Sequence, residues 1–135
     1  MSLKLVGPLN TGTTAGGAGV STANASTTTS VVGLVHSVYV KYNGAPPAGT
    51  TDITVKTVGT SPAPPSVTFL TLVNAATDGW FYPRVPAQDN AGTDVTFNGT
   101  QEIYIKYAVH DLINVTIAQA NDGDSADVWF LLECN

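Results

Sequence analysis

The sequence predicts an all-β protein, a single antiparallel β-sandwich, jelly-roll-like, of about eight strands, formed by residues 1–135. Residues that favour helices, such as Glu, Lys, Arg and Met, are sparse, whereas Val, Thr, Gly and Pro abound. Short runs of alternating apolar and polar residues recur between clusters of Gly, Pro, Asn and Asp, which is the pattern of strands joined by turns. Because no crossover helices are expected, two packed antiparallel sheets are the natural arrangement.

The N-terminal part combines one short strand with a long low-complexity segment. The first expected strand runs from Ser2 to Val6 and ends at Gly7-Pro8. Residues 10–30 are built mostly from Thr, Ala, Gly and Ser, with Val20 as the one large apolar side chain. Such a segment has little apolar surface to bury, so we expect a flexible arm or a long loop.

Val31 to Tyr42 is the longest expected strand. Simple alternation puts one set of side chains on one face: Val32, Leu34, Val38, Val40 and Tyr42. It puts a second set on the other face: Val31, Val35 and Tyr39. Because both sets are apolar, we expect both faces of this strand to be covered. The Pro- and Gly-rich stretch from Gly44 to Gly49 follows as a turn-rich loop.

The rest of the chain continues the strand pattern. The expected strands are Asp52–Val58, Val67–Val73, Trp80–Val85, Val95–Phe97, Glu102–Val109, and two more around 113–117 and 128–132. Because it contains Pro83, the run Trp80–Val85 is expected to be an edge strand or a bulge. Asn121–Asp124 is expected to be a hairpin turn. The expected inward side chains are Val38, Val40, Val55, Phe69, Ile103, Ile105, Val115, Ile117 and Phe130.

Composition narrows the possible function. Only 11% of the residues are charged, and none is between Leu5 and Val40, whereas roughly a quarter is usual in soluble domains. Such a surface fits a protein that rests against other proteins. The net charge is −5 and the five basic residues are scattered, which argues against nucleic-acid binding. No stretch is long enough to span a membrane, and no signal-peptide pattern is present, so we expect synthesis in the cytoplasm.

Groups that carry catalysis are few. His36 lies within a strand pattern and His110 precedes Asp111, but no nucleophile motif accompanies them, so both are interpreted as structural. Cys134 is interpreted as an inert thiol beside Glu133. Asp122, Asp124 and Asp127 are weak candidates for a calcium site, but they also fit a hairpin turn, which is the favoured interpretation. We therefore expect no enzyme, no cofactor and no metal.

The aromatic run from Trp80 to Arg84 has three possible interpretations. Its large side chains could belong to the core, to a protein interface or to a platform on which sugars stack. Trp, Tyr and Arg are enriched at interface hot spots. We therefore take Trp80, Tyr82 and Arg84 as candidate partner-binding residues.

Three stretches resemble the head decoration (cement) proteins of tailed bacteriophages: SLKLVGPLNTGTT, AATDGWFYPRV and INVTIAQANDGDSADVWFLLE. This resemblance implies a small, mostly β protein that assembles as a dimer or trimer and clamps subunits of the capsid. It implies the major capsid protein as partner and the exterior of the virion as location, in a particle made in the host cytoplasm. The alternative hypothesis is a carbohydrate- or ligand-binding β-sandwich, such as a phage fibre tip or a binding module.

Overall fold

The computed structural model describes residues 1–43 and 47–135, and within them it contains eleven strands and no helix. Part of the expected loop Gly44–Gly49 lies outside the described residues. The strands are β1 (Ser2–Asn10), β2 (Ser21–Ser26), β3 (Val31–Tyr42), β4 (Asp52–Thr57), β5 (Thr68–Leu72), β6 (Gly79–Phe81), β7 (Val85–Pro86), β8 (Tyr104–Ile105), β9 (Ala108–Asp111), β10 (Ile113–Ala120) and β11 (Ala126–Cys134). Nowhere in the described ranges is there a helix that could cross a membrane.

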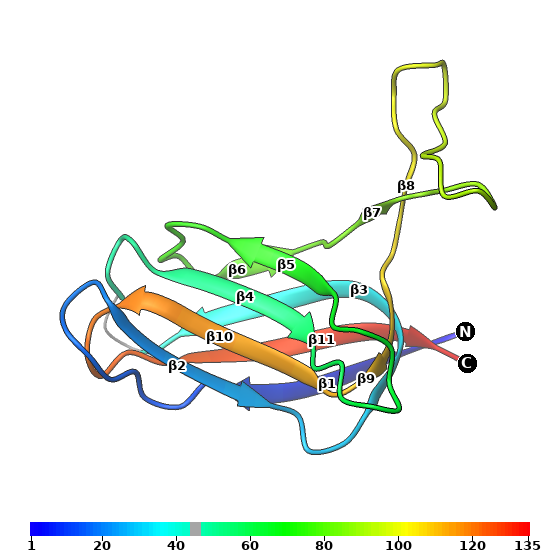
Figure 1. Cartoon of the computed structure of the whole chain (residues 1–135). Helices are drawn as coiled ribbons and strands as arrows, with labels where there is room; N and C mark the ends of the chain where they lie inside the picture. Colours follow the sequence, from blue (N-terminus) through cyan, green and yellow to red (C-terminus); the bar gives the residue numbers. More distant parts are fainter. Residues whose placement is uncertain (44–46) are drawn as a thin grey trace.

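Two antiparallel sheets form the body of the molecule (Figure 1). The five-stranded sheet has the order β1-β11-β3-β6, and β9 also pairs with β3. The four-stranded sheet has the order β2-β10-β4-β5. These sheets confirm the all-β antiparallel class. The described residues form eleven strands where about eight were expected, and β1, which was expected to end at Gly7-Pro8, continues to Asn10. The jelly-roll topology stays a prediction.

Buried side chains from both sheets meet in one core. Fully or almost fully buried are the expected inward residues Val38, Val40, Val55, Phe69, Val115, Ile117 and Phe130. The prediction is wrong for Ile103 and Ile105, which are 40% and 51% exposed. Both alternate like strand residues, but they belong to a segment that leaves the sandwich.

A β-bulge changes which residues of β3 face the core. Leu131 pairs with Ser37 and Leu132 pairs with Val35, so His36 is an extra residue on β3. An extra residue reverses the alternation of the side chains. Before the bulge, Val31 and Val35 are buried, and after it Val38, Val40 and Tyr42 are buried. The expectation that Val32 and Leu34 share a face with Val38 is therefore wrong, and both side chains are exposed.

The segment from residue 10 to residue 30 is not confirmed as an arm. Ser21–Ser26 forms β2, an edge strand paired with β10. Thr11 and Thr14 are buried, and their hydroxyl groups accept hydrogen bonds from the backbone N–H groups of Ala126 and Asp124 at 3.1 and 2.9 Å. Hydroxyl and backbone hydrogen bonds attach this segment to the sandwich in place of apolar burial.

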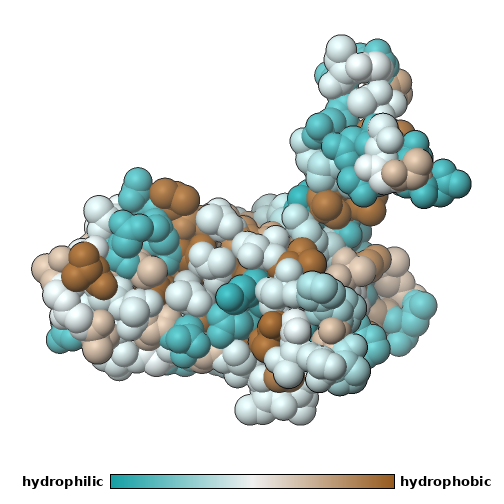
Figure 2. All heavy atoms as spheres, viewed as in Figure 1, coloured by the Kyte–Doolittle hydropathy of each residue, from teal (hydrophilic) through white to brown (hydrophobic). Residues whose placement is uncertain are grey.

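A different segment leaves the sandwich. Residues 82–107, here called the projecting arm, connect β6 to β9 and carry the two-stranded sheet β7-β8. Figure 1 shows it rising beyond the side of the sandwich where β5 and β6 lie, and in Figure 2 it stands clear of the body. One edge of β3 pairs with β11. The other edge is therefore shared by β6 and β9, and the chain leaves the sandwich between these two strands.

Candidate functional site

The projecting arm is a short stalk that carries two turns. Val85 pairs with Ile105 in the stalk, and above it the amide of Ala87 donates to the carbonyl of Ile103 at 2.7 Å. In the first turn, Asp89 Oδ1 accepts hydrogen bonds from the amides of Ala91 and Thr93. In the second turn, the side chain of Asn98 accepts from the amides of residues 100 and 101. Local hydrogen bonds therefore define the arm's shape.

The arm has no core of its own. Every residue from 88 to 105 is exposed. Among these exposed residues are the large apolar side chains of Val95, Phe97, Ile103, Tyr104 and Ile105. Phe97, next to the second turn, is 79% exposed. Apolar side chains displayed in this way on a single chain are typical of a surface that binds a partner.

The arm is also acidic. Between residues 85 and 105 the charged side chains are Asp89, Asp94 and Glu102, with no Lys or Arg. Glu102 Oε2 accepts a hydrogen bond from the hydroxyl of Tyr104 at 2.6 Å, and this interaction raises the pKa of Tyr104 above its usual value. The arm thus combines negative charge with exposed apolar surface.

Two cationic side chains fasten the two legs of the arm. On the outgoing leg, Arg84 Nη1 donates to the carbonyls of His36 and Pro83 at 3.1 and 2.7 Å. On the returning leg, Lys106 Nζ lies 2.9 Å from Glu133 Oε1. Next to that contact, the amide of Val35 donates to the carbonyl of Tyr107 at 2.8 Å. Both legs are therefore held at the bulge of β3.

The outer face of the five-stranded sheet is apolar. Its exposed large side chains, between 40% and 61% exposed, are Leu3, Leu5, Val32, Leu34 and Trp80. Tyr39 packs between Trp80 and Trp129, with ring centroids 5.0 and 5.7 Å apart and the ring planes tilted by 48° and 47°. Leu131 pairs with Leu5. This surface is called the apolar face below.

The outer face of the four-stranded sheet is polar by contrast. Its side chains, placed on one face by the strand register, are Asn24, Ser26, Thr54, Lys56, Thr71, Asn114 and Thr116. Figure 2 looks onto this side of the molecule and shows mainly neutral and hydrophilic residues there. The two outer sides of the sandwich therefore differ in polarity.

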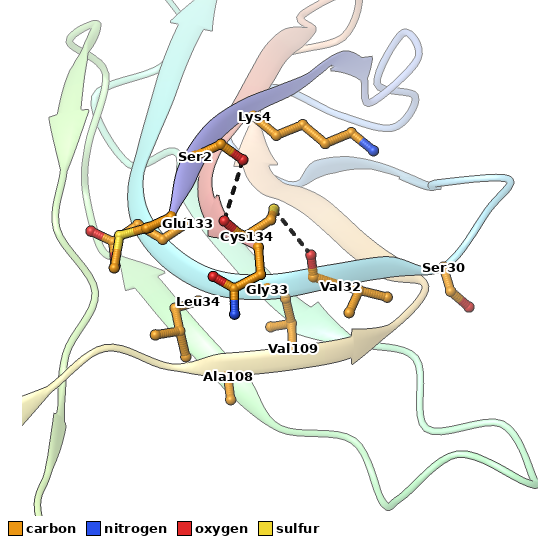
Figure 3. Close-up of a pocket in the computed structure, with 12 residues that line it drawn as sticks. Ser2, Lys4, Ser30, Val32, Gly33, Leu34, Ala108, Val109, Glu133 and Cys134 are labelled. Carbon is orange, nitrogen blue, oxygen red and sulfur yellow. Dashed lines mark hydrogen bonds between the residues drawn. The ribbon is translucent and has the colours of Figure 1, made fainter.

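A groove of about 850 Å³ lies at the end of the five-stranded sheet beside the two termini. Figure 3 shows Val32 and Leu34 on its wall, and the Cys134 thiol donates to the Val32 carbonyl at 3.5 Å. Glu133 also lines it, and its Oε2 atom is buried without a hydrogen-bond partner in the described structure. Two members of the apolar face thus continue into this groove.

The candidate partner-binding residues lie at three different places. Trp80 is part of the apolar face, and Tyr82 is exposed at the start of the arm, edge-on to His36. Arg84 is half-buried and holds the arm on the sandwich, so its role here is structural. The structure does not bring the three side chains together in one cluster.

The acidic turn is a hairpin between β10 and β11. Asp124 is buried and its Oδ2 accepts from the amide of Asn121 at 2.9 Å, whereas Asp127 accepts from the side chain of Asn10 at 2.9 Å. Asp122 is exposed. Within residues 1–43 and 47–135, no three His, Cys, Asp or Glu side chains gather as metal ligands would.

The two histidines lie on different strands. His36 Nδ1 is 3.0 Å from the hydroxyl of Ser37, its neighbour on β3, while His110 is exposed on β9. No carboxylate hydrogen-bonds to either ring in the described part of the chain. A base oriented by a carboxylate, as acyl transfer requires, is therefore not assembled there.

Sequence reasoning missed the projecting arm. The signal for the arm is a pair of turn sequences, Asp89–Gly92 and Asn98–Gly99, that lie close together and indicate local turns in this segment. For the apolar face, the apolar residues on both alternating positions of β3 predicted cover on both sides, whereas within this chain Val32 and Leu34 on the outer side are exposed. Comparison with protein-family models, curated proteins and solved structures finds no match to this chain.

Proposed function

We propose that this protein is a structural virion protein, which binds the outer surface of a phage capsid and stabilises it by bridging capsid subunits. The observation that carries the proposal is the projecting arm, in which every residue from 88 to 105 is exposed. Phe97 and Ile105 are apolar side chains that only a partner could bury. The resemblance of the sequence to phage head decoration proteins supplies the class of partner.

The major capsid protein is the proposed partner. Residues 85–105 of the arm carry Asp89, Asp94 and Glu102 without Lys or Arg, which favours a docking surface with positive charge around an apolar depression. Such attraction accelerates association and weakens as salt is added. Assembly would take place in the host cytoplasm, and the protein would remain on the virion exterior.

The test compares binding of arm variants to purified undecorated phage heads. In one variant, Asn-Gly replaces residues 88–102, because Ala87 and Ile103 are already paired and a two-residue turn suits such a pair. In a second variant, Phe97→Asp places a charge at the tip, and Val73→Asp is its control, since Val73 is 65% exposed on the body. Cosedimentation with heads measures binding.

We expect both arm variants to keep the circular dichroism of the parent and to bind heads at least tenfold more weakly. Val73→Asp should bind like the parent. If the shortened protein binds heads as tightly as the full chain, the arm is not the attachment element and this proposal fails.

A carbohydrate-binding module is the second candidate, and one observation favours it. Trp80 and Tyr82 are exposed aromatic side chains of the kind on which sugars stack. A glycan array separates the two functions: sugar binding that is lost in Trp80→Ala but kept in Phe97→Asp would support the module and contradict capsid attachment through the arm.

A further inference from the structure

We infer that the apolar face binds a second copy of this chain, so that two sandwiches pack back to back through their five-stranded sheets. This inference is independent of the proposed function, because it concerns a surface other than the arm. It assigns the uncovered side of the sheet to a specific partner.

The first argument is the pattern of burial in β3 and β11. Both strands carry apolar side chains on both faces, as strands covered on two sides do. The inner set is buried in the core, while Val32 and Leu34 on the outer set are exposed. The polar face opposite shows how this chain builds a surface for water, with Thr, Asn and Ser.

The second argument is charge. The chain carries −5 overall, so two copies repel each other unless the surfaces that meet are neutral. On the apolar face the charges balance: Lys106 pairs with Glu133 at 2.9 Å, and Lys41 lies opposite Asp127 in the strand register. A neutral surface can meet its own copy without repulsion, whereas the acidic arm cannot.

The third argument is area. Half-exposed side chains of this size present on the order of 100 Å² each, so the apolar face offers roughly 600 Å² with its partly buried aromatic residues included. A specific interface needs about 800 Å² from each partner, of which somewhat more than half is apolar. The apolar face and its polar surroundings are sufficient for that.

The geometry also suits a two-fold contact. A surface that meets its own copy forms a closed dimer, and two sheets pack face to face about 10 Å apart with their strands nearly aligned. The turns of the arm stand beyond the β5 and β6 side of the sandwich (Figure 1). The packed rings of Trp80, Tyr39 and Trp129 would lie within the contact.

The experiment uses the two tryptophans of the chain, Trp80 and Trp129, since both lie on the apolar face. Sedimentation velocity and tryptophan emission are measured from about 0.5 to 100 μM, a range that brackets a micromolar Kd expected of a modest interface. Leu5→Asp puts a charge on the apolar face. Thr54→Asp on the polar face and Phe97→Asp on the arm are matched controls.

We expect the parent and both controls to change from 13.9 kDa to twice that mass as concentration rises, with a blue shift of the emission. Leu5→Asp should remain a monomer, with an emission that does not change. The inference is overturned if the parent stays monomeric throughout, if it forms trimers, or if Leu5→Asp dimerises as tightly as the parent. Dimers without an emission change would also overturn it.

Discussion

The guanidinium of Arg84 donates a hydrogen bond over 3.1 Å to the carbonyl oxygen of His36, the extra residue of the bulge in β3. A bulge frees a backbone group from the ladder and bends the strand. Here the freed carbonyl holds the outgoing leg of the projecting arm. The irregularity of one strand thus determines where the arm leaves the sandwich.

Two phenylalanines test the assignment of core and arm. Phe130 is fully buried between the sheets, so Phe130→Ala should lower the free energy of unfolding by about 3–5 kcal/mol. The same substitution at Phe97, on the exposed arm, should change it by less than about 0.5 kcal/mol. Urea denaturation measures both. Equal losses would show that the arm packs on the body.

The ion pair at the returning leg should contribute to stability. Lys106→Met leaves Glu133, whose side chain is only 11% exposed, without its partner. We expect a loss of about 1–2 kcal/mol, below the value for fully buried pairs because Lys106 is partly exposed. Lys56→Met on the polar face is the control.

Adding Glu133→Gln to Lys106→Met should restore part of that loss, since the unpaired charge is then removed. A double-mutant cycle by thermal denaturation measures the coupling. A coupling energy near zero would mean that the contact does not fasten the arm.

Tyr42 should make the protein sensitive to high pH. Burial first, and then the negative charges of Asp78 and Asp52, raise the pKa of Tyr42 to about 12, from 10.0. The folded protein therefore keeps this proton more tightly than the unfolded chain, so its contribution is complete below pH 10 and is lost as pH rises from 10 to 12. The expected loss is up to about 2 kcal/mol.

Other groups also titrate in that range, so the difference between the parent and Tyr42→Phe isolates the effect. Tyr42→Phe also removes the hydrogen bond to the carbonyl of Ala75, which should lower stability by about 1 kcal/mol at pH 8. Urea denaturation at several pH values would contradict the assignment if the two proteins lost stability in parallel between pH 10 and 12.

Substitutions at two glycines, Gly33 and Gly99, distinguish the effect of steric contact on stability from that of backbone strain. A Cβ atom on Gly33 would lie 2.8 Å from the carbonyl oxygen of Glu133, and its φ is +147°. Gly99 also has a positive φ, +85°, but open space around it. We expect Gly33→Ala to lower stability by about 3 kcal/mol and Gly99→Ala by about 1 kcal/mol, as measured by thermal denaturation.

The strands with apolar alternation were predictable from sequence. Val31–Tyr42 has the expected bounds, and Ile117 and Phe130 face the core as expected. β2 was not predictable in this way, because hydroxyl and backbone hydrogen bonds hold it rather than apolar burial. Alternation at Ile103 and Ile105 misled for the opposite reason, since these residues alternate like a half-buried strand but belong to the arm and are exposed.

The candidate site was predictable in part. Trp80 and Tyr82 are exposed, as partner-binding residues must be. Arg84 was chosen for its residue type, but its position depends on the bulge at His36, which one strand's sequence does not reveal. A bulge arises from pairing with a second strand.

The separation of the arm from the core has an evolutionary consequence. Residues 88–105 contribute little to folding, because none of them is buried in the chain itself, whereas in the proposed function they carry recognition. Mutations there can therefore accumulate without lowering the free energy of unfolding below the value that the sandwich needs. Under this architecture the arm is free to follow a changing partner surface, while selection on the sandwich keeps its interior constant.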